Sequence, residues 1–143
     1  IENDFGIIHN GRDQKEDKSQ AEARKRAEKI WREAQAGDAV AQYRLGQAYM
    51  HGNSEASLEP DAEQAEQWLQ KAAVQRHHDA QYALGVFYQS AGDDVGAYAW
   101  LSIAASGTND LASQLREASA KRMTGAQLAE ARQMIGQLKG EIK

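Results

Sequence analysis

The two adjacent histidines, His77 and His78, are the residues most able to do chemistry, because imidazole is the commonest metal ligand in proteins. Neighbouring residues on a helix point about 100° apart, whereas helical metal sites favour ligands four residues apart. His78 shares a helix face with Tyr82, but zinc sites are built from Cys, His and carboxylate side chains. We therefore interpret the pair as structural or surface residues, with metal binding as the alternative.

The usual nucleophile motifs are absent from the sequence. It contains no cysteine, no G-x-S-x-G motif and no phosphate-binding loop. The carboxylates of Asp93 and Asp94 fit a turn and a helix N-cap better than a calcium site or a catalytic pair. We expect no catalytic residue, no metal and no cofactor, and hence a protein that is not an enzyme. A hydrolase is the weakest candidate, since no acid pair stands at a defined spacing.

A repeated segment is the strongest signal in the chain. Residues 41–49 read A-Q-Y-R-L-G-Q-A-Y, and residues 80–88, 39 positions later, read A-Q-Y-A-L-G-V-F-Y, with six of nine residues identical. A second signature, Ala-x-x-Trp-Leu-x-x-Ala-Ala, stands at 65–73 and 97–105, with a weaker copy at 27–34. Repeats of about 20–50 residues are typical of stacked helical arrays, which usually bind other molecules.

The elements that carry these repeats are expected to be helices. Helix-forming residues dominate, there is one proline, and no segment shows the alternation of a strand. Asp38 is expected to cap one helix, and Thr124 with Gln127 forms a capping box for another. We predict an all-α fold with seven helices, over residues 18–36, 38–51, 61–75, 78–91, 94–106, 109–122 and 125–139.

The small and large residues of the repeats indicate how the helices pack. Gly46 and Gly85 stand in the middle of predicted helices, where glycine costs about 1 kcal/mol relative to alanine. Close approach of a neighbouring helix is the expected reason for both glycines. Trp68 and Trp100 are expected to be buried between small residues of adjacent helices.

The N-terminal residues do not share this pattern. Residues 1–17 are polar, contain glycines and show no helical period, which predicts a tail. The tail is expected either to be flexible or to dock on the helices through Phe5, Ile7 and Ile8. The remaining residues, 18–140, are predicted to form one repeat domain.

The alternation of the two signatures resembles the Sel-1-like repeat family, a branch of the tetratricopeptide-like helical repeats. The resemblance is carried by A-Q-Y-x-L-G-x-x-Y at 41–49 and 80–88 and by W-L-x-K-A-A at 68–73, and it covers about residues 27–135. The segment from Ala97 to Met134 is similar to the end of bacterial members. The resemblance implies a right-handed α-solenoid of stacked antiparallel helix pairs. Arg76 is a departure, because the family usually has glycine there.

The resemblance implies protein binding as the function. Family members commonly bind a peptide or a partner protein and help to assemble or localise a complex, in bacteria often at the envelope. It also suggests that the Tyr-Leu-Gly helices line the concave side, which gives as partner-binding residues Tyr43, Gln47, Met50, His51, Tyr82, Val86 and Gln89. Packing between helices is the alternative role of the two tyrosines. The alternative function is accessory binding of a cell-envelope polymer or a cell-wall enzyme.

Charge and hydropathy set broader limits. A net charge of −4 and a pI near 5.6 argue against nucleic acid as a partner. The basic stretch at 24–32 is interleaved with glutamates, which predicts paired charges on a solvated helix. No apolar run reaches the roughly 18 residues of a membrane span, and no signal peptide is recognised. Because the sequence starts at Ile1 and lacks cysteine, we expect a processed or trimmed chain that is periplasmic or otherwise exported, with the cytoplasm as the alternative.

Overall fold

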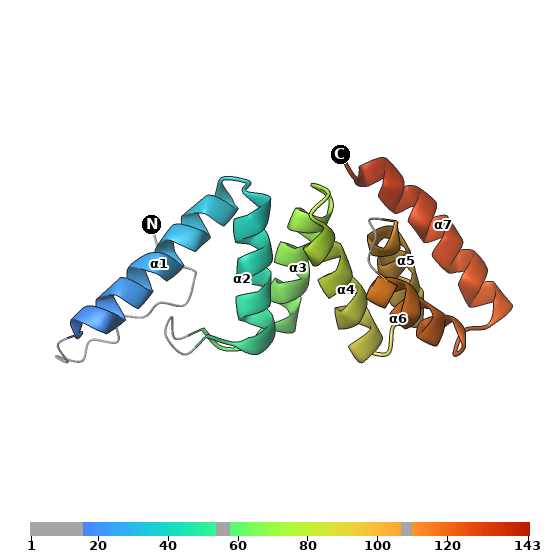
Figure 1. Cartoon of the computed structure of the whole chain (residues 1–143), viewed down its shortest axis with the longest axis horizontal. Helices are drawn as coiled ribbons and strands as arrows, with labels where there is room; N and C mark the ends of the chain where they lie inside the picture. Colours follow the sequence, from blue (N-terminus) through green and yellow to red (C-terminus); the bar gives the residue numbers. More distant parts are fainter. Residues whose placement is uncertain (1–15, 54–57, 107–109) are drawn as a thin grey trace. The chain divides into compact units, whose positions relative to one another are not determined.

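The computed structural model describes residues 16–53, 58–106 and 110–143, and these form seven α-helices without a β-strand (Figure 1). The helices are α1 (Lys18–Gln35), α2 (Ala39–His51), α3 (Ala62–Ala73), α4 (His78–Ser90), α5 (Asp94–Ala105), α6 (Asp110–Ala120) and α7 (Gly125–Glu141). The predicted all-α class is confirmed, and each helix ends within two residues of its expected bounds. The predicted tail falls almost entirely outside the described residues, so the domain bounds stay a prediction.

The helices begin where side chains satisfy their first free N–H groups. The Asp38 carboxylate accepts a hydrogen bond from the Ala41 N–H at 2.8 Å, as expected for an N-cap. At α7 the predicted capping box is present, with the Thr124 and Gln127 side chains each accepting from the other's N–H. Side chains within three residues therefore define these helix starts.

The chain divides into two compact units, and the division falls within α3. The first unit ends at Trp68 and the second begins at Leu69. In the first, α1 packs on α2, and its core consists of Ala27, Ala34, Ala41, Leu45, Tyr49, Leu58, Ala65 and Trp68. In the second, α5 contacts α4, α6 and α7, and a buried cluster is formed by Ala97, Leu101, Ala104 and Ala112. Helix α5 is therefore the centre of the second unit.

Two features of the packing confirm the roles predicted for the small and large residues. A Cβ atom on Gly85 would lie 2.5 Å from Cγ and Cδ2 of Leu101, which shows that α5 approaches α4 too closely for a side chain there. Trp68 and Trp100 are buried, with exposed fractions of 6% and 1%. Gly46 is also buried, and its expected close approach stays a prediction.

The turns before the two Tyr-Leu-Gly helices have the same hydrogen bonds but different residues. Between α1 and α2, the Gly37 N–H donates to the Ala34 carbonyl at 3.1 Å; between α3 and α4, the Arg76 N–H donates to the Ala73 carbonyl at 3.1 Å. Gly37 has φ 105° and Arg76 has φ 66°. A side chain in this left-handed region costs about 1–2 kcal/mol, so Arg76 keeps a glycine conformation at an energetic cost.

Candidate functional site

The two Tyr-Leu-Gly helices each bury one face and leave a flank half-exposed. Leu45 and Tyr49 of α2 and Leu84 of α4 are buried. The predicted partner-binding residues lie to the side of these, at positions i, i+4 and i+7 of each helix, and all six are half-buried: Tyr43, Gln47 and Met50 on α2, and Tyr82, Val86 and Gln89 on α4. The fold therefore presents the same row in both repeats, within its own unit in each case.

On α2 the row is pre-organised by a hydrogen bond. The Gln47 side-chain amide donates to the Tyr43 hydroxyl oxygen at 2.9 Å. Met50 packs against the core of the first unit, while His51, one residue further on, is exposed. The pair of Tyr43 and Gln47 thus forms a fixed polar and aromatic surface one helical turn long.

On α4 the equivalent residues are tied to neighbouring helices. Tyr82 packs against the cluster around Ala97 and Leu101. The Gln89 amide nitrogen donates to the Leu115 carbonyl and to the Ser119 hydroxyl of α6, both at 2.9 Å. Gln89 therefore links α4 to α6. The side chain of Val86 is apolar and forms no hydrogen bond.

Two exposed residues of α2, Val40 and Arg44, were missed by the sequence analysis. Val40 is 49% exposed and Arg44 is exposed. Together with Gln47 and His51 they stand three or four residues apart, so the four side chains share one face of α2. Neither Val40 nor Arg44 recurs in the second repeat, so a search for repeated residues passed over them. Counting outward from the buried Leu45 could have found both. We call Val40, Arg44, Gln47 and His51 the outer row of α2.

The glutamine of the A-Q-Y signature has a structural role that the sequence did not reveal. The Gln42 amide nitrogen donates to the Ala34 carbonyl, and that of Gln81 donates to the Ala73 carbonyl, each at 3.1 Å and eight residues upstream. The last carbonyls of a helix have no intrahelical partner. Both glutamines therefore bind the end of the preceding helix, which explains why each repeat contains one.

Replacing these glutamines with methionine is expected to have unequal effects. Gln42→Met should lower the free energy of unfolding by about 1 kcal/mol, the net value of a typical hydrogen bond. Gln81→Met should cost less, because it also removes Oε1 of Gln81, a buried acceptor with no hydrogen-bond partner, whereas Gln42 makes a further contact. Urea denaturation of the two variants measures the difference, and a larger loss for Gln81→Met would contradict this account.

The His77 side chain, a possible metal ligand, caps helix α4. Nδ1 of His77 accepts a hydrogen bond from the Ala80 N–H at 3.1 Å, at the position where Asp38 caps α2. His78 is exposed at the first position of α4. Among residues 16–53, 58–106 and 110–143, no three His, Cys, Asp or Glu side chains are grouped as a metal site would need.

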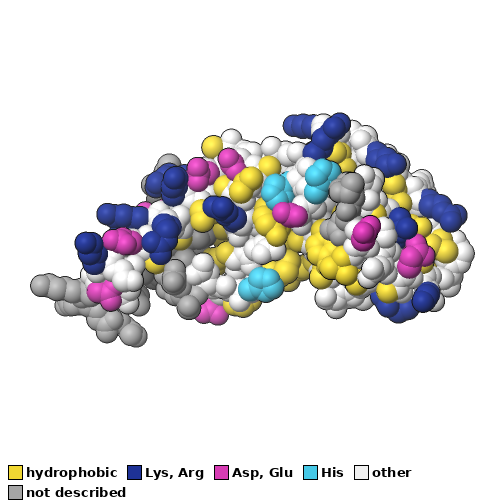
Figure 2. Space-filling view, viewed as in Figure 1, with side chains coloured by type: hydrophobic (Ala, Val, Ile, Leu, Met, Phe, Trp, Pro, Cys, Tyr) yellow, Lys and Arg dark blue, Asp and Glu magenta, His cyan; other side chains and the backbone are white. Residues whose placement is uncertain are grey.

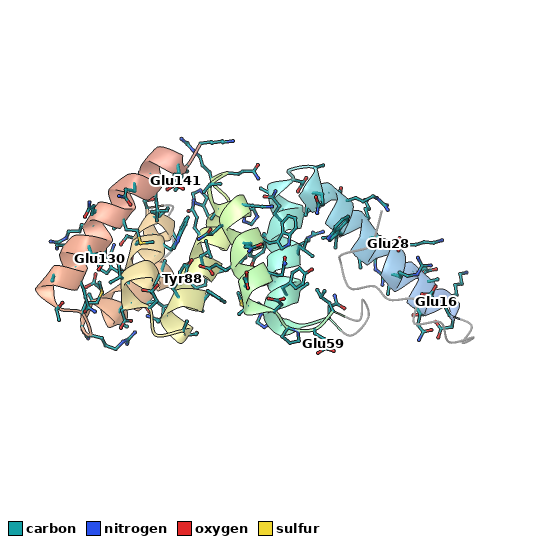
Figure 3. All side chains as sticks on the ribbon, turned by 180° about the vertical axis from the view of Figure 1, so that it is seen from behind. Glu16, Glu28, Glu59, Tyr88, Glu130 and Glu141 are labelled. Carbon is teal, nitrogen blue, oxygen red and sulfur yellow. The ribbon has the colours of Figure 1, made fainter. Side chains whose placement is uncertain are left out.

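Ion pairs lie on α1 and in the second unit. Arg24 of α1 lies 3.0 Å from Glu16 and 3.1 Å from Glu28, and these bonds raise the pKa of Arg24. Figure 3 labels the two glutamates. In the second unit, the Arg122 guanidinium lies 2.7 Å from Asp94 and lowers the pKa of that carboxyl. Figure 2 shows basic and acidic side chains mixed over α1. The predicted pairing of the basic stretch is thus confirmed for Arg24.

Comparison with known proteins places the repeats in a wider group. The model of a family described as Sel1 repeat matches residues 39–77 and 78–109, so each match begins at a Tyr-Leu-Gly helix. The chain is similar to the crystal structure of c5321, described as a protective antigen present in uropathogenic Escherichia coli strains displaying an SLR fold. The TM-score is 0.72 at 28% identity, and the match covers 92% of this chain but 28% of that one.

The comparisons bear on the fold more than on the activity. No match is found among curated proteins. The antiparallel helix pairs and the similarity to a solved SLR fold confirm the predicted class, an all-α solenoid. No helix in the described part of the chain is long and apolar enough to span a membrane.

Proposed function

Because the chain belongs to the Sel-1-like repeat family, whose members are generally protein–protein interaction modules, we propose that it is a non-catalytic adaptor. It binds a peptide or a partner protein through its Tyr-Leu-Gly helices and helps to assemble or localise a complex. The SLR fold is typically a non-catalytic scaffold, which supports this assignment. The partner is a protein, with no nucleic acid involved.

The outer row of α2 is the observation that carries the proposal. It combines an apolar side chain in Val40, a cation in Arg44, an amide in Gln47 and an imidazole in His51. Protein interfaces are built from such mixtures of apolar and polar groups. The fixed pair of Tyr43 and Gln47 adjoins this row and extends it.

Burial of two of the three tryptophans favours a protein partner over an envelope polymer. Sugar rings bind on exposed aromatic faces, and Trp68 and Trp100 are 6% and 1% exposed, while Trp31 is partly buried against the core of the first unit. An accessory role toward a cell-wall enzyme remains compatible with protein binding. We propose a bacterial periplasm or another exported location, with the cytoplasm as the alternative, and the similarity to a bacterial protein supports the bacterial part of this proposal.

Removing both tyrosine side chains is expected to weaken binding while the chain stays folded. A partner is first identified by cross-linking and mass spectrometry in the source organism and then titrated calorimetrically. Tyr43→Ala combined with Tyr82→Ala should weaken it about tenfold or more, since central aromatic anchors contribute most of the binding energy. Circular dichroism should show unchanged helix content. Loss of the melting transition would instead identify the tyrosines as packing residues.

A charge-matched pair of variants tests the outer row. Arg44→Gln should weaken the same complex, whereas Arg132→Gln, an identical change at an exposed position of α7, should not. Equal effects of the two variants would mean that Arg44 contributes to binding only through the net charge of the protein. Normal binding by Arg44→Gln and by the double tyrosine variant would place the interface on another surface.

A further inference from the structure

The chain that leaves α7 is held on the turn between α3 and α4. The Lys143 N–H donates to the Val74 carbonyl at 2.9 Å, and Nε of Arg76 donates back to the Lys143 carbonyl. Ile142, between the helix and this contact, has extended backbone angles of φ −73° and ψ 125°. Two reciprocal hydrogen bonds thus join segments 67 residues apart within the second unit (Figure 1).

Arg76 makes this contact from a strained backbone position. It is the one residue other than glycine with positive φ among those the structure describes, and its counterpart in the preceding turn is Gly37. Glycine adopts this conformation without a steric cost. Backbone strain at a residue is retained where the side chain has a task that offsets it. The Arg76 side chain hydrogen-bonds the Lys143 carbonyl, and this contact supplies that task.

Charge alone does not account for the arrangement. Helices α3 and α7 both end near Arg76, and a cation is favourable at a helix C-terminus. A lysine would serve that purpose equally well. The Nε–H of arginine stands where lysine has a methylene group, so a lysine cannot donate to the Lys143 carbonyl from the same position. Substitution by lysine therefore separates the two explanations.

We propose that Arg76 is a latch that fixes the end of α7 to the turn between α3 and α4. Helix α7 packs on α5 and buries Ala131 and Leu138. With the latch closed, the last turn of α7 is tied to a part of the chain outside its own helix pair. With the latch open, that turn frays. The latch thereby sets how often the C-terminal end of α7 opens.

Hydrogen exchange on the full chain tests the latch. In Arg76→Gly, amides of Ile142 and Lys143 should exchange about tenfold faster, which corresponds to about 1.4 kcal/mol of local opening free energy. Amides of α4 and α5 should be unchanged. The variant is expected to fold, since glycine suits the turn, as at Gly37. Unchanged exchange at Ile142 and Lys143 would overturn the proposal.

Two further variants make the result specific. Arg76→Lys keeps the charge and should exchange as fast as Arg76→Gly; slow exchange in this variant would assign the effect to the helix ends and reject the latch. Lys143→Pro removes the N–H that Val74 accepts and is compatible with the extended Ile142. If the two hydrogen bonds act together, adding Arg76→Gly to Lys143→Pro should accelerate exchange at Ile142 by less than twofold. A further full tenfold increase would show that the two bonds act independently.

Discussion

Replacing Trp100 with alanine is expected to lower the free energy of unfolding by about 3–5 kcal/mol. Trp100 is 1% exposed on α5, the helix that contacts α4, α6 and α7. Because neighbours surround α5 on several sides, they cannot all move in to fill the space left by the indole. Guanidinium denaturation followed by circular dichroism measures the loss.

The same substitution at Trp31 is the matched control. Trp31 lies on α1 and is only partly buried, packed against the core of the first unit. Trp31→Ala should therefore cost clearly less than Trp100→Ala, since part of the cavity is open to solvent. Equal losses, or an unchanged melt of Trp100→Ala, would show that α5 is not the centre of the second unit.

The helices could be predicted because their signals are local. The starts of α2 and α7 depend on side chains within three residues, as at Asp38 and Thr124, and these pairs are visible in sequence. The spacing of small and large residues then identified Gly85 and Trp100 as packing positions. Each of these inferences needs only the helical period and the size of a side chain.

The role of the repeated glutamines could not be predicted in this way. In sequence, Gln42 and Gln81 stand out because they recur, but recurrence does not reveal what they contact, and polar residues are mostly exposed. Their burial depends on a carbonyl at the end of another helix, eight residues upstream. Arg76 is a similar case, because its contact with Lys143 joins distant parts of the sequence.

The candidate site was predictable in part. The half-exposed row of Tyr43 and Gln47 follows from the same period that places Leu45 inside. Arg44 was missed because attention to repeated residues favours structural positions over those that differ between repeats. Gln89 was predicted to bind a partner, but its two hydrogen bonds to α6 span 26 and 30 residues. Contacts at such separations cannot be inferred from the helical period.

The second large effect is expected from adding a single methyl group at Gly85. Gly85→Ala should lower the free energy of unfolding by about 1–3 kcal/mol, although alanine is the better helix former. The new Cβ would lie 2.5 Å from two side-chain atoms of Leu101 and 3.3 Å from its backbone nitrogen. Leu101 is fully buried, so its side chain has no free space into which to move.

An identical change on α7 isolates the cause. Gly136 also stands inside a helix, but nothing lies within 4 Å of a Cβ added there. Gly136→Ala should therefore raise the free energy of unfolding by about 1 kcal/mol, the difference in helix propensity. The two variants differ only in whether a neighbouring helix is close, so opposite shifts of the denaturation midpoint measure that approach directly. Stabilisation of both would mean that α4 and α5 can separate at little cost, and that the glycine of the Tyr-Leu-Gly signature has another purpose.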